Sequence, residues 1–320
     1  MSESWNLPER DVTPEAALVN RRAWLKWLGL GTLAFGSGAG LWWWRHRGTD
    51  AEVLGTGNAE GKFASFYPAK RSPLFADADR PLTAEAPAAR YCNFYEFSSG
   101  KAVWREVERF QPLPWMLEVS GLVTRPRAFD LENLHREFPL EERIYRHRCV
   151  EAWAMVIPWT GFPLSALLNT VEPLPEARYV RFESFYRPDQ ASQQRSSRLP
   201  WPYTEGLTLA EAMNELAFVV TGMYGHPLLK QHGAPVRLVV PWKYGFKSAK
   251  SIVRIELTAE RPKTFWNTMA PHEYGFEANV EPEVPHPRWS QKNERMLDTG
   301  EIRQSVLYNG YGEWVASLYS

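Results

Sequence analysis

The sequence predicts an α+β fold, and three observations lead to this prediction. The chain has 320 residues, of which 44% are apolar and 14% aromatic, enough to bury a sizeable core. Short segments with strand periodicity and short segments with helical periodicity follow one another without a regular strand–helix–strand repeat, which argues against a parallel α/β fold. The 25 prolines indicate many interrupted elements. We therefore expect mixed sheets with short helices.

Local patterns place the first elements of the domain. Residues 115–119 alternate apolar and polar side chains like a half-buried strand. Asp130 can accept a free backbone N–H at the start of a short helix that Pro139 ends. The apolar side of this helix holds Leu131, Leu134 and Phe138. Residues 162–171 predict a second short helix.

The later elements follow from the same rules. Residues 178–186 predict a strand. One face of that strand holds Val180, Phe182, Ser184 and Tyr186. Thr208 and Glu211 have the spacing of a capping box, which opens a helix through about Leu216. Two strands rich in β-branched residues are predicted at 235–241 and 250–257, and the loop 242–249 joins them.

The first 47 residues have the form of a twin-arginine export signal. Arg21-Arg22 precede the acid-free apolar run 27–44, and a basic stop follows at 45–47. A chance arginine pair before a buried helix is the alternative. Because no clean cleavage site follows, an uncut segment would tether the chain to the inner membrane. Residues 48–90 show no sustained period and predict an extended segment that leads into a domain at 91–320.

Charge and cysteine content exclude several classes of protein. The chain carries 37 Lys+Arg and 37 Asp+Glu, so no field of the whole protein draws it to nucleic acid, and we expect no nucleic-acid partner. Its two cysteines are too few for a disulfide scaffold or a four-thiolate zinc site. P-loop, G-x-G-x-x-G and G-x-S-x-G patterns are all missing from the sequence, so nucleotide-binding and serine-hydrolase functions have little support.

Cys149 is the first candidate for chemistry. It follows three potentially cationic residues at 146–148, and positive neighbours lower the pKa of a thiol and favour the thiolate that binds soft metals or attacks electrophiles. The alternative is a structural disulfide to Cys92, which an oxidising compartment permits. If the segment is a strand, Glu151 projects on the same side as Cys149 and either steers a proton or pairs with an arginine.

The second candidate is a basic segment, residues 216–255, that contains no acid. Its cations are Lys230, Arg237, Lys243, Lys247, Lys250 and Arg254. A phosphate-bearing ligand would explain the imbalance, and the loop 243–250 offers ammonium groups, a hydroxyl and backbone N–H groups around one glycine. A solvated basic surface is the alternative. Trp153, Trp159, Trp201 and Trp242 are predicted to be core or cleft walls.

Several multi-residue blocks occur together in one order along the chain. They are Tyr91–Phe97, Phe138–Arg146 leading to Arg148–Trp153, Gly233–Arg237, Val240–Lys247, Pro287–Gln291 and Asn309–Tyr319. In these blocks the chain resembles the catalytic molybdenum subunits of the bacterial periplasmic protein-methionine-sulfoxide reductases. The resemblance runs from the twin-arginine pattern to the C-terminus.

This resemblance implies a sulfite-oxidase-like α+β fold that holds one molybdenum on the dithiolene of molybdopterin. It assigns Cys149 as the thiolate ligand of the metal and gives Glu151 a catalytic role beside it. The positions that match the family's contacts to the pterin and its phosphate are Cys92, Tyr95, Glu96, Ser184, His232, Arg237, Ser248, Ala249 and Lys250. Three of them depart from the common family residues: Cys92 and His232 each replace an Asn, and Ser184 replaces a Thr.

The resemblance also implies a function and partners. Methionine sulfoxide in oxidised periplasmic proteins would be reduced by oxygen-atom transfer to reduced molybdenum. The electrons would come from a membrane b-haem subunit linked to the quinone pool, and the twin-arginine translocase would export the folded chain to the periplasm. Two alternatives remain open. One is a molybdenum enzyme that acts on small S- or N-oxides or on sulfite, and the other is a non-enzymatic exported binding domain with a Cys92–Cys149 disulfide.

Overall fold

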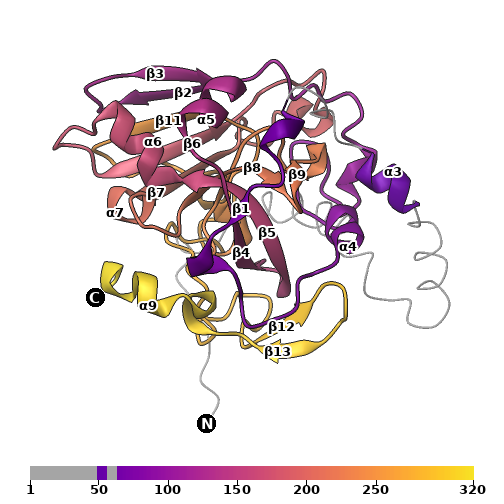
Figure 1. Cartoon of the computed structure of the whole chain (residues 1–320). Helices are drawn as coiled ribbons and strands as arrows, with labels where there is room; N and C mark the ends of the chain where they lie inside the picture. Colours follow the sequence, from indigo (N-terminus) through magenta and orange to yellow (C-terminus); the bar gives the residue numbers. More distant parts are fainter. Residues whose placement is uncertain (1–48, 56–62) are drawn as a thin grey trace, which may run out of the picture. The chain divides into compact units, whose positions relative to one another are not determined.

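A computed structural model describes residues 49–55 and 63–320, and the structural statements below concern these residues. The predicted export signal, or tether, at 1–47 lies outside them. Within this part of the chain no helix is both long and apolar enough to cross a membrane. The fold consists of two mixed sheets with short helices around them, so the predicted α+β class is confirmed (Figure 1).

The larger sheet has eight strands and provides β4, the strand that leads into Cys149. Its strands are β1 (Lys70–Arg71), β4 (Glu141–Arg148), β5 (Trp153–Pro163), β8 (Phe218–Met223), β9 (His226–Pro227), β10 (Arg237–Val239), β12 (Asn293–Met296) and β13 (Ile302–Gln304). The order β1-β4-β5-β12-β13 forms one path, and β8 pairs with β5, β9 and β10. The β12–β13 hairpin lies at the opposite end of the domain from β2 and β3 (Figure 1).

Strand β5 corrects the prediction of a helix from residue 162. Every residue from Trp153 to Phe162 is buried, since neighbouring strands and helices cover both faces. A strand buried on both faces is apolar throughout rather than alternating, so its period does not distinguish it from a buried helix. The helix α6 (Leu164–Val171) therefore begins two residues later than predicted.

The smaller sheet has five strands in the order β3-β2-β11-β6-β7. They are β2 (Met116–Gly121), β3 (Arg127–Asp130), β6 (Tyr179–Ser184), β7 (Thr204–Thr208) and β11 (Ile252–Thr258). The predicted alternation of β6 is confirmed for Val180, Phe182 and Ser184, which are buried. Tyr186 was placed on the same face, but it lies beyond the end of the strand and is exposed.

The predicted strands at 235–241 and 250–257 exist but belong to different sheets. Strand β10 pairs with β8 in the larger sheet, whereas β11 pairs with β2 and β6 in the smaller one. The loop 242–249 therefore passes from one sheet to the other. This crossing loop and strands β4, β5, β8 and β10 of the larger sheet contribute residues to the cavity described below.

The helices are short, as the prolines indicate. They are α3 (Asp50–Leu54), α4 (Glu85–Arg90), α5 (Leu131–Glu137), α6, α7 (Leu209–Ala212), α8 (Phe265–Met269) and α9 (Gly312–Val315). The capping box of Thr208 and Glu211 is confirmed. Helix α7 ends four residues before the predicted Leu216, because the Asn214 side chain accepts the Leu216 N–H (3.0 Å) and so stabilises a turn.

Residues 63–90, in the range predicted as an extended leading segment, lie against the larger sheet. Strand β1 adds to β4 in parallel. Further along, the Thr83 N–H donates to the carbonyl of Val156 (3.0 Å), and the Val156 N–H donates to the Thr83 hydroxyl (3.0 Å). The segment is thus hydrogen-bonded to the central strands at two places.

The start of α5 allows a direct test of the capping argument. The Asp130 carboxylate accepts the Asn133 N–H at 2.7 Å, as predicted. Asp130→Ala should lower the free energy of unfolding by about 1 kcal/mol, measured by urea denaturation. Asp130→Asn keeps the acceptor and serves as the control. An alanine variant as stable as the asparagine variant would contradict the capping role.

Candidate active site

Ten of the eleven predicted site residues line one cavity with about 890 Å³ of empty volume. They are Cys92, Tyr95, Glu96, Cys149, Glu151, His232, Arg237, Ser248, Ala249 and Lys250. The eleventh, Ser184, lies behind the wall and donates its hydroxyl to the carbonyl of Lys250 at 2.6 Å. The fold therefore brings together residues that are up to 158 positions apart in the sequence.

Cys149 lies at the turn between β4 and β5. Its N–H donates to the carbonyl of Trp153 (2.9 Å), and its carbonyl accepts the Ala152 N–H (2.9 Å). The sulfur accepts the N–H of Glu151 (3.5 Å) and the side-chain amide of Asn93 (3.5 Å). The Glu151 carboxylate is 3.9 Å from the sulfur. Glu151 is close because of this turn, and not because the segment continues as a strand.

The predicted lowering of the pKa of Cys149 by its cationic neighbours is wrong for the free thiol. Burial first and the charge of Glu151 second raise this pKa to about 12, although Lys101 and Arg148 act in the opposite direction. Burial, with Arg237 and Lys250, lowers the pKa of His147 to about 3, so this residue is neutral. A metal bound to this sulfur would take the place of the proton and favour the thiolate.

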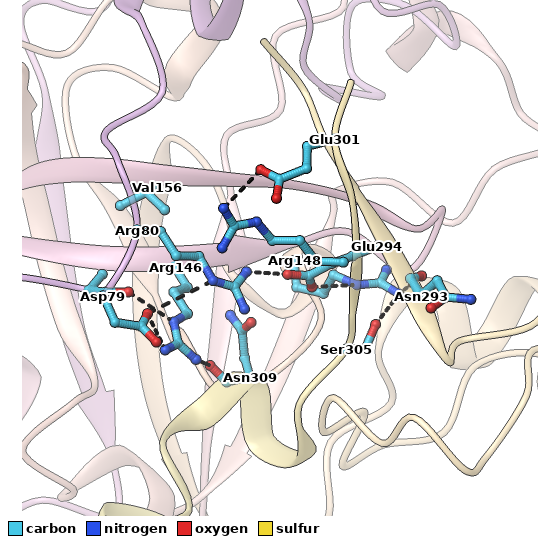
Figure 2. Close-up of polar contacts among 12 residues, drawn as sticks. Asp79, Arg80, Arg146, Arg148, Val156, Asn293, Glu294, Glu301, Ser305 and Asn309 are labelled. Carbon is cyan, nitrogen blue, oxygen red and sulfur yellow. Dashed lines mark hydrogen bonds and ion pairs between the residues drawn. The ribbon is translucent and has the colours of Figure 1, made fainter. Parts of the chain in front are cut away.

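His147 lines the cavity and its neighbours Arg146 and Arg148 do not, because side chains alternate along β4. Figure 2 shows the two arginines among their polar contacts. Arg148 donates to the carbonyl of its neighbour Cys149 and to the Gln291 side chain (2.9 Å), and it lies 3.2 Å from the Glu294 carboxylate. Further along β4, Arg146 pairs with Asp79 and donates to the carbonyl of Asn309 (3.0 Å). The two arginines anchor the segment 291–309 to β4, the strand that leads into Cys149.

A polar cluster at the cavity mouth holds the Glu151 carboxylate. The Lys101 ammonium contacts both Glu151 and the side-chain oxygen of Asn93. The Trp153 indole N–H donates to the same carboxylate (3.1 Å). Burial acts to raise the pKa of Glu151, but the Lys101 charge and these hydrogen bonds hold it below the usual range. Sequence reasoning did not identify Lys101 or Asn93.

The segment 92–96 forms another wall. The Cys92 thiol donates to the carbonyl of Gln231 (3.4 Å), and both cysteines are free thiols, so the disulfide of the non-enzymatic alternative is not formed. The Tyr95 ring packs edge-on against Trp266, with centroids 4.8 Å apart. Burial raises the pKa of Glu96 to about 7. Of the predicted tryptophan walls, Trp153 and Trp159 line the cavity, and sequence reasoning missed Tyr203, Trp266 and Tyr274.

The other part of the cavity is cationic. Arg237 donates to the carbonyls of His232 (2.8 Å) and Ser248 (3.2 Å). Lys250 donates to two carbonyls, both at 2.8 Å. Within the described part of the chain neither cation forms an ion pair with a carboxylate. The Nε2 atom of His232 is buried without a hydrogen-bond partner there.

Buried cations without counter-ions are costly, and the pKa values reflect this cost. Burial lowers the pKa of Arg237 to about 10 and that of Lys250 to about 8. A phosphate would pair with both groups and give the unpaired nitrogen of His232 a partner. With a soft thiol nearby for a metal, the donors of this cavity fit a phosphorylated metal cofactor such as molybdenum-molybdopterin.

The phosphate interpretation of the basic segment 216–255 holds only in part. Three of its six cations form ion pairs with carboxylates from outside the segment. These pairs are Lys243–Glu211 (2.5 Å), Lys247–Glu205 (2.7 Å) and Arg254–Glu118 (3.2 Å). The predicted anion nest in loop 243–250 is therefore wrong for Lys243 and Lys247, which do not line the cavity. The carboxylates that balance these cations are distant in the sequence, so they lie outside the segment 216–255.

Residues 104–266, half of the chain, match the family described as the oxidoreductase molybdopterin binding domain. The chain belongs to this family of molybdopterin-binding oxidoreductases. Over 98% of its length it is 46% identical to the protein-methionine-sulfoxide reductase catalytic subunit MsrP of Pseudomonas syringae pv. tomato, of which it covers 94%. The resemblance inferred from the sequence blocks is confirmed.

A solved structure also resembles part of the chain. It is the sulfane dehydrogenase SoxCD from Paracoccus pantotrophus, with a TM-score of 0.40 and 23% identity. The similarity covers 47% of this chain and 40% of that one.

Proposed function

We propose that this chain is the catalytic subunit of a protein-methionine-sulfoxide reductase that uses one molybdenum-molybdopterin. The observation that carries the proposal is the 46% identity to MsrP over nearly the whole chain, in a protein whose cavity combines a buried thiol with unpaired cations. When bound, the cofactor would supply two-electron oxygen-atom transfer, by which methionine sulfoxide, two electrons and two protons give the thioether and water.

Each part of the cavity has a role in this proposal. The Cys149 sulfur would bind the metal, and the backbone at Ser248 and Ala249, together with Arg237 and Lys250, would hold the pterin phosphate; all of these residues line the cavity. The carboxylate of Glu151, fixed by Lys101 and Trp153, steers the protons that the reduction consumes. The aromatic walls orient the side chain of the substrate and limit the access of water.

The compartment and the partners belong to the same proposal. The twin-arginine pattern at 1–47 supports export by the twin-arginine translocase, after the cofactor is inserted in the cytoplasm. The substrates are then oxidised periplasmic proteins. The electrons come from a membrane b-haem subunit fed by quinones, and an uncut signal segment would hold the chain beside it.

The decisive experiment uses the full chain matured in cells that make the cofactor. Metal analysis and pterin fluorescence should give one molybdenum and one pterin per chain. With a reduced dye as electron donor, the holoenzyme should reduce methionine sulfoxide in an oxidised protein with a higher kcat/KM than small S- or N-oxides. A higher kcat/KM for the small oxides, or oxidation of sulfite, would favour the alternative molybdenum enzyme, and metal-free chain with full activity would contradict the proposal.

Arg237 provides a test of the phosphate site. Arg237→Met should lower the pterin content per milligram of purified protein about tenfold, because a hydrogen bond to a charged group contributes about 1.5–3 kcal/mol. Pterin fluorescence after oxidative release measures the content. The matched control is Arg254→Met, which removes an exposed cation from the same basic segment. Equal pterin content in the two variants would show that Arg237 does not hold the cofactor.

A further inference from the structure

A second hollow adjoins the active-site cavity, and the reaction proposed above does not use it. It has about 830 Å³ of empty volume. We call it the acidic groove; its lining comes mostly from residues 273–286, with Arg261, Gln291 and residues near 150 and 244–246. It shares Val150, Phe246 and Tyr274 with the cavity. The groove therefore begins where the cavity ends.

The groove has a fixed position relative to Cys149. The carbonyl of Val150, the residue after Cys149, accepts the indole N–H of Trp289 (2.7 Å) and the side-chain amide of Gln291 (2.8 Å). The Tyr274 ring packs edge-on against Phe246, with centroids 5.3 Å apart. These contacts tie the groove to the turn that carries the thiol. A polypeptide with one side chain in the cavity would have its neighbouring residues beside this surface.

The charge of the groove is negative. Its lining contains one cation, Arg261, and three acids, Glu273, Glu277 and Glu281. Glu273 pairs with Arg288 (2.7 Å), but Glu277 and Glu281 form no ion pair among the residues that the structure covers. Burial lowers the pKa of the lining residue His286, so it adds no charge at neutral pH. With Glu273 paired, Glu277 and Glu281 against the single cation Arg261 leave the groove a net negative charge, which attracts a cationic partner.

The same surface also offers apolar contacts. Val284 and Pro285 are exposed, and the Phe276 ring has the Arg261 guanidinium 5.1 Å from its centroid. Lysine and arginine lay their aliphatic stems along such surfaces while the charged head reaches a carboxylate. A strongly acidic segment would meet like charge here. The chemistry of the groove therefore fits a basic polypeptide.

From this geometry we infer that the acidic groove docks the polypeptide that flanks the oxidised methionine and selects lysine or arginine within about five residues of it. The inference rests on the proposed function and adds a substrate class to it. Charge at the rim of an interface affects association and discrimination more than the chemical step, so the effect should depend on ionic strength.

The test uses the holoenzyme and peptides of equal length with a single methionine sulfoxide flanked by three lysines, three glutamines or three glutamates. At low ionic strength kcat/KM should be about three- to tenfold higher for the lysine peptide than for the glutamine peptide, and lowest for the glutamate peptide. In about 0.5 M salt the lysine preference should shrink to less than twofold.

The variant Glu277→Gln/Glu281→Gln should bring the lysine-to-glutamine ratio of kcat/KM close to one. The matched control Glu283→Gln/Glu313→Gln makes the same change in net charge at two exposed acids outside the groove lining, and it should keep the wild-type ratio. Equal kcat/KM for the three peptides, or the same loss of preference in the control, would overturn the inference.

A binding measurement keeps this result separate from the proposed function. Peptides that carry methionine sulfone are not reduced, so their binding can be measured without turnover. Titration calorimetry should show the tightest binding for the lysine peptide, weaker binding for the glutamine peptide and the weakest for the glutamate peptide. Reduction of free methionine sulfoxide and of all three peptides without preference would leave the proposed function intact and refute the docking site. If the holoenzyme reduced no sulfoxide, the proposed function would fail, and equal binding of the three sulfone peptides would refute the docking site as well.

Discussion

Cys149→Ser should lose methionine sulfoxide reduction by at least about 100-fold, together with the spectroscopic signature of a thiolate-bound metal. Mutation of the groups that surround a metal ligand already lowers metal affinity or activity about ten- to 100-fold, and this variant removes the ligand itself. A serine hydroxyl is a harder donor with a far higher pKa, so it replaces the thiolate poorly. The measurements are kcat with an oxidised protein, molybdenum content and the absorption spectrum of the oxidised holoenzyme.

The comparison with Cys92→Ser separates the role of a ligand from that of a buried thiol. Cys92 lines the same cavity, and its thiol donates a hydrogen bond to the carbonyl of Gln231, which a serine hydroxyl can also make. Cys92→Ser should therefore keep most of the metal and its spectrum. Full activity and an unchanged spectrum in Cys149→Ser would remove Cys149 as the metal ligand.

Lys243→Met should lower the free energy of unfolding by about 3–5 kcal/mol. The Lys243 ammonium and the Glu211 carboxylate are both almost completely buried and lie 2.5 Å apart. Removing the lysine leaves a buried carboxylate without its cation. It also removes the hydrogen bond that the Lys243 ammonium donates to the Asn279 side-chain oxygen (2.8 Å). Urea denaturation of the purified chain measures the change.

Two further variants make this stability prediction specific. Lys243→Met/Glu211→Gln should recover part of the loss, because no uncompensated charge remains. Arg254→Met breaks the exposed pair with Glu118, whose side chains are 43% and 48% exposed, and should cost less than about 1 kcal/mol. Equal losses for Lys243→Met and Arg254→Met would show that burial of the pair does not govern its contribution.

The parts of the fold that could be predicted from the sequence depend on near neighbours. Asp130 caps a helix through a residue three positions away, and the alternation of β6 is a property of six consecutive residues. Strand β5 was missed because burial on both faces removes its alternation. Tyr186 was misplaced since the end of a strand is set by its partners and not by its own sequence.

The residues of the candidate site also fall into those that the local sequence marks and those that only distant contacts define. Cys149 and the cations Arg237 and Lys250 could be singled out because local composition marks them. Lys101 reaches Glu151 across 50 positions, and nothing near Lys101 in the sequence indicates that contact. The acids that pair with Lys243 and Lys247 are likewise distant in the sequence, so the unpaired cations could be recognised only in three dimensions.

The arginine contacts behind Cys149 also set a time order for maturation. Arg80 and Arg148 both reach Glu294, and Arg146 reaches Asn309, so the end of β4 depends on residues that follow it by about 150 positions (Figure 2). A ribosome adds these residues long after β4. A nascent chain that lacks them would therefore offer the cofactor an unfinished receptor.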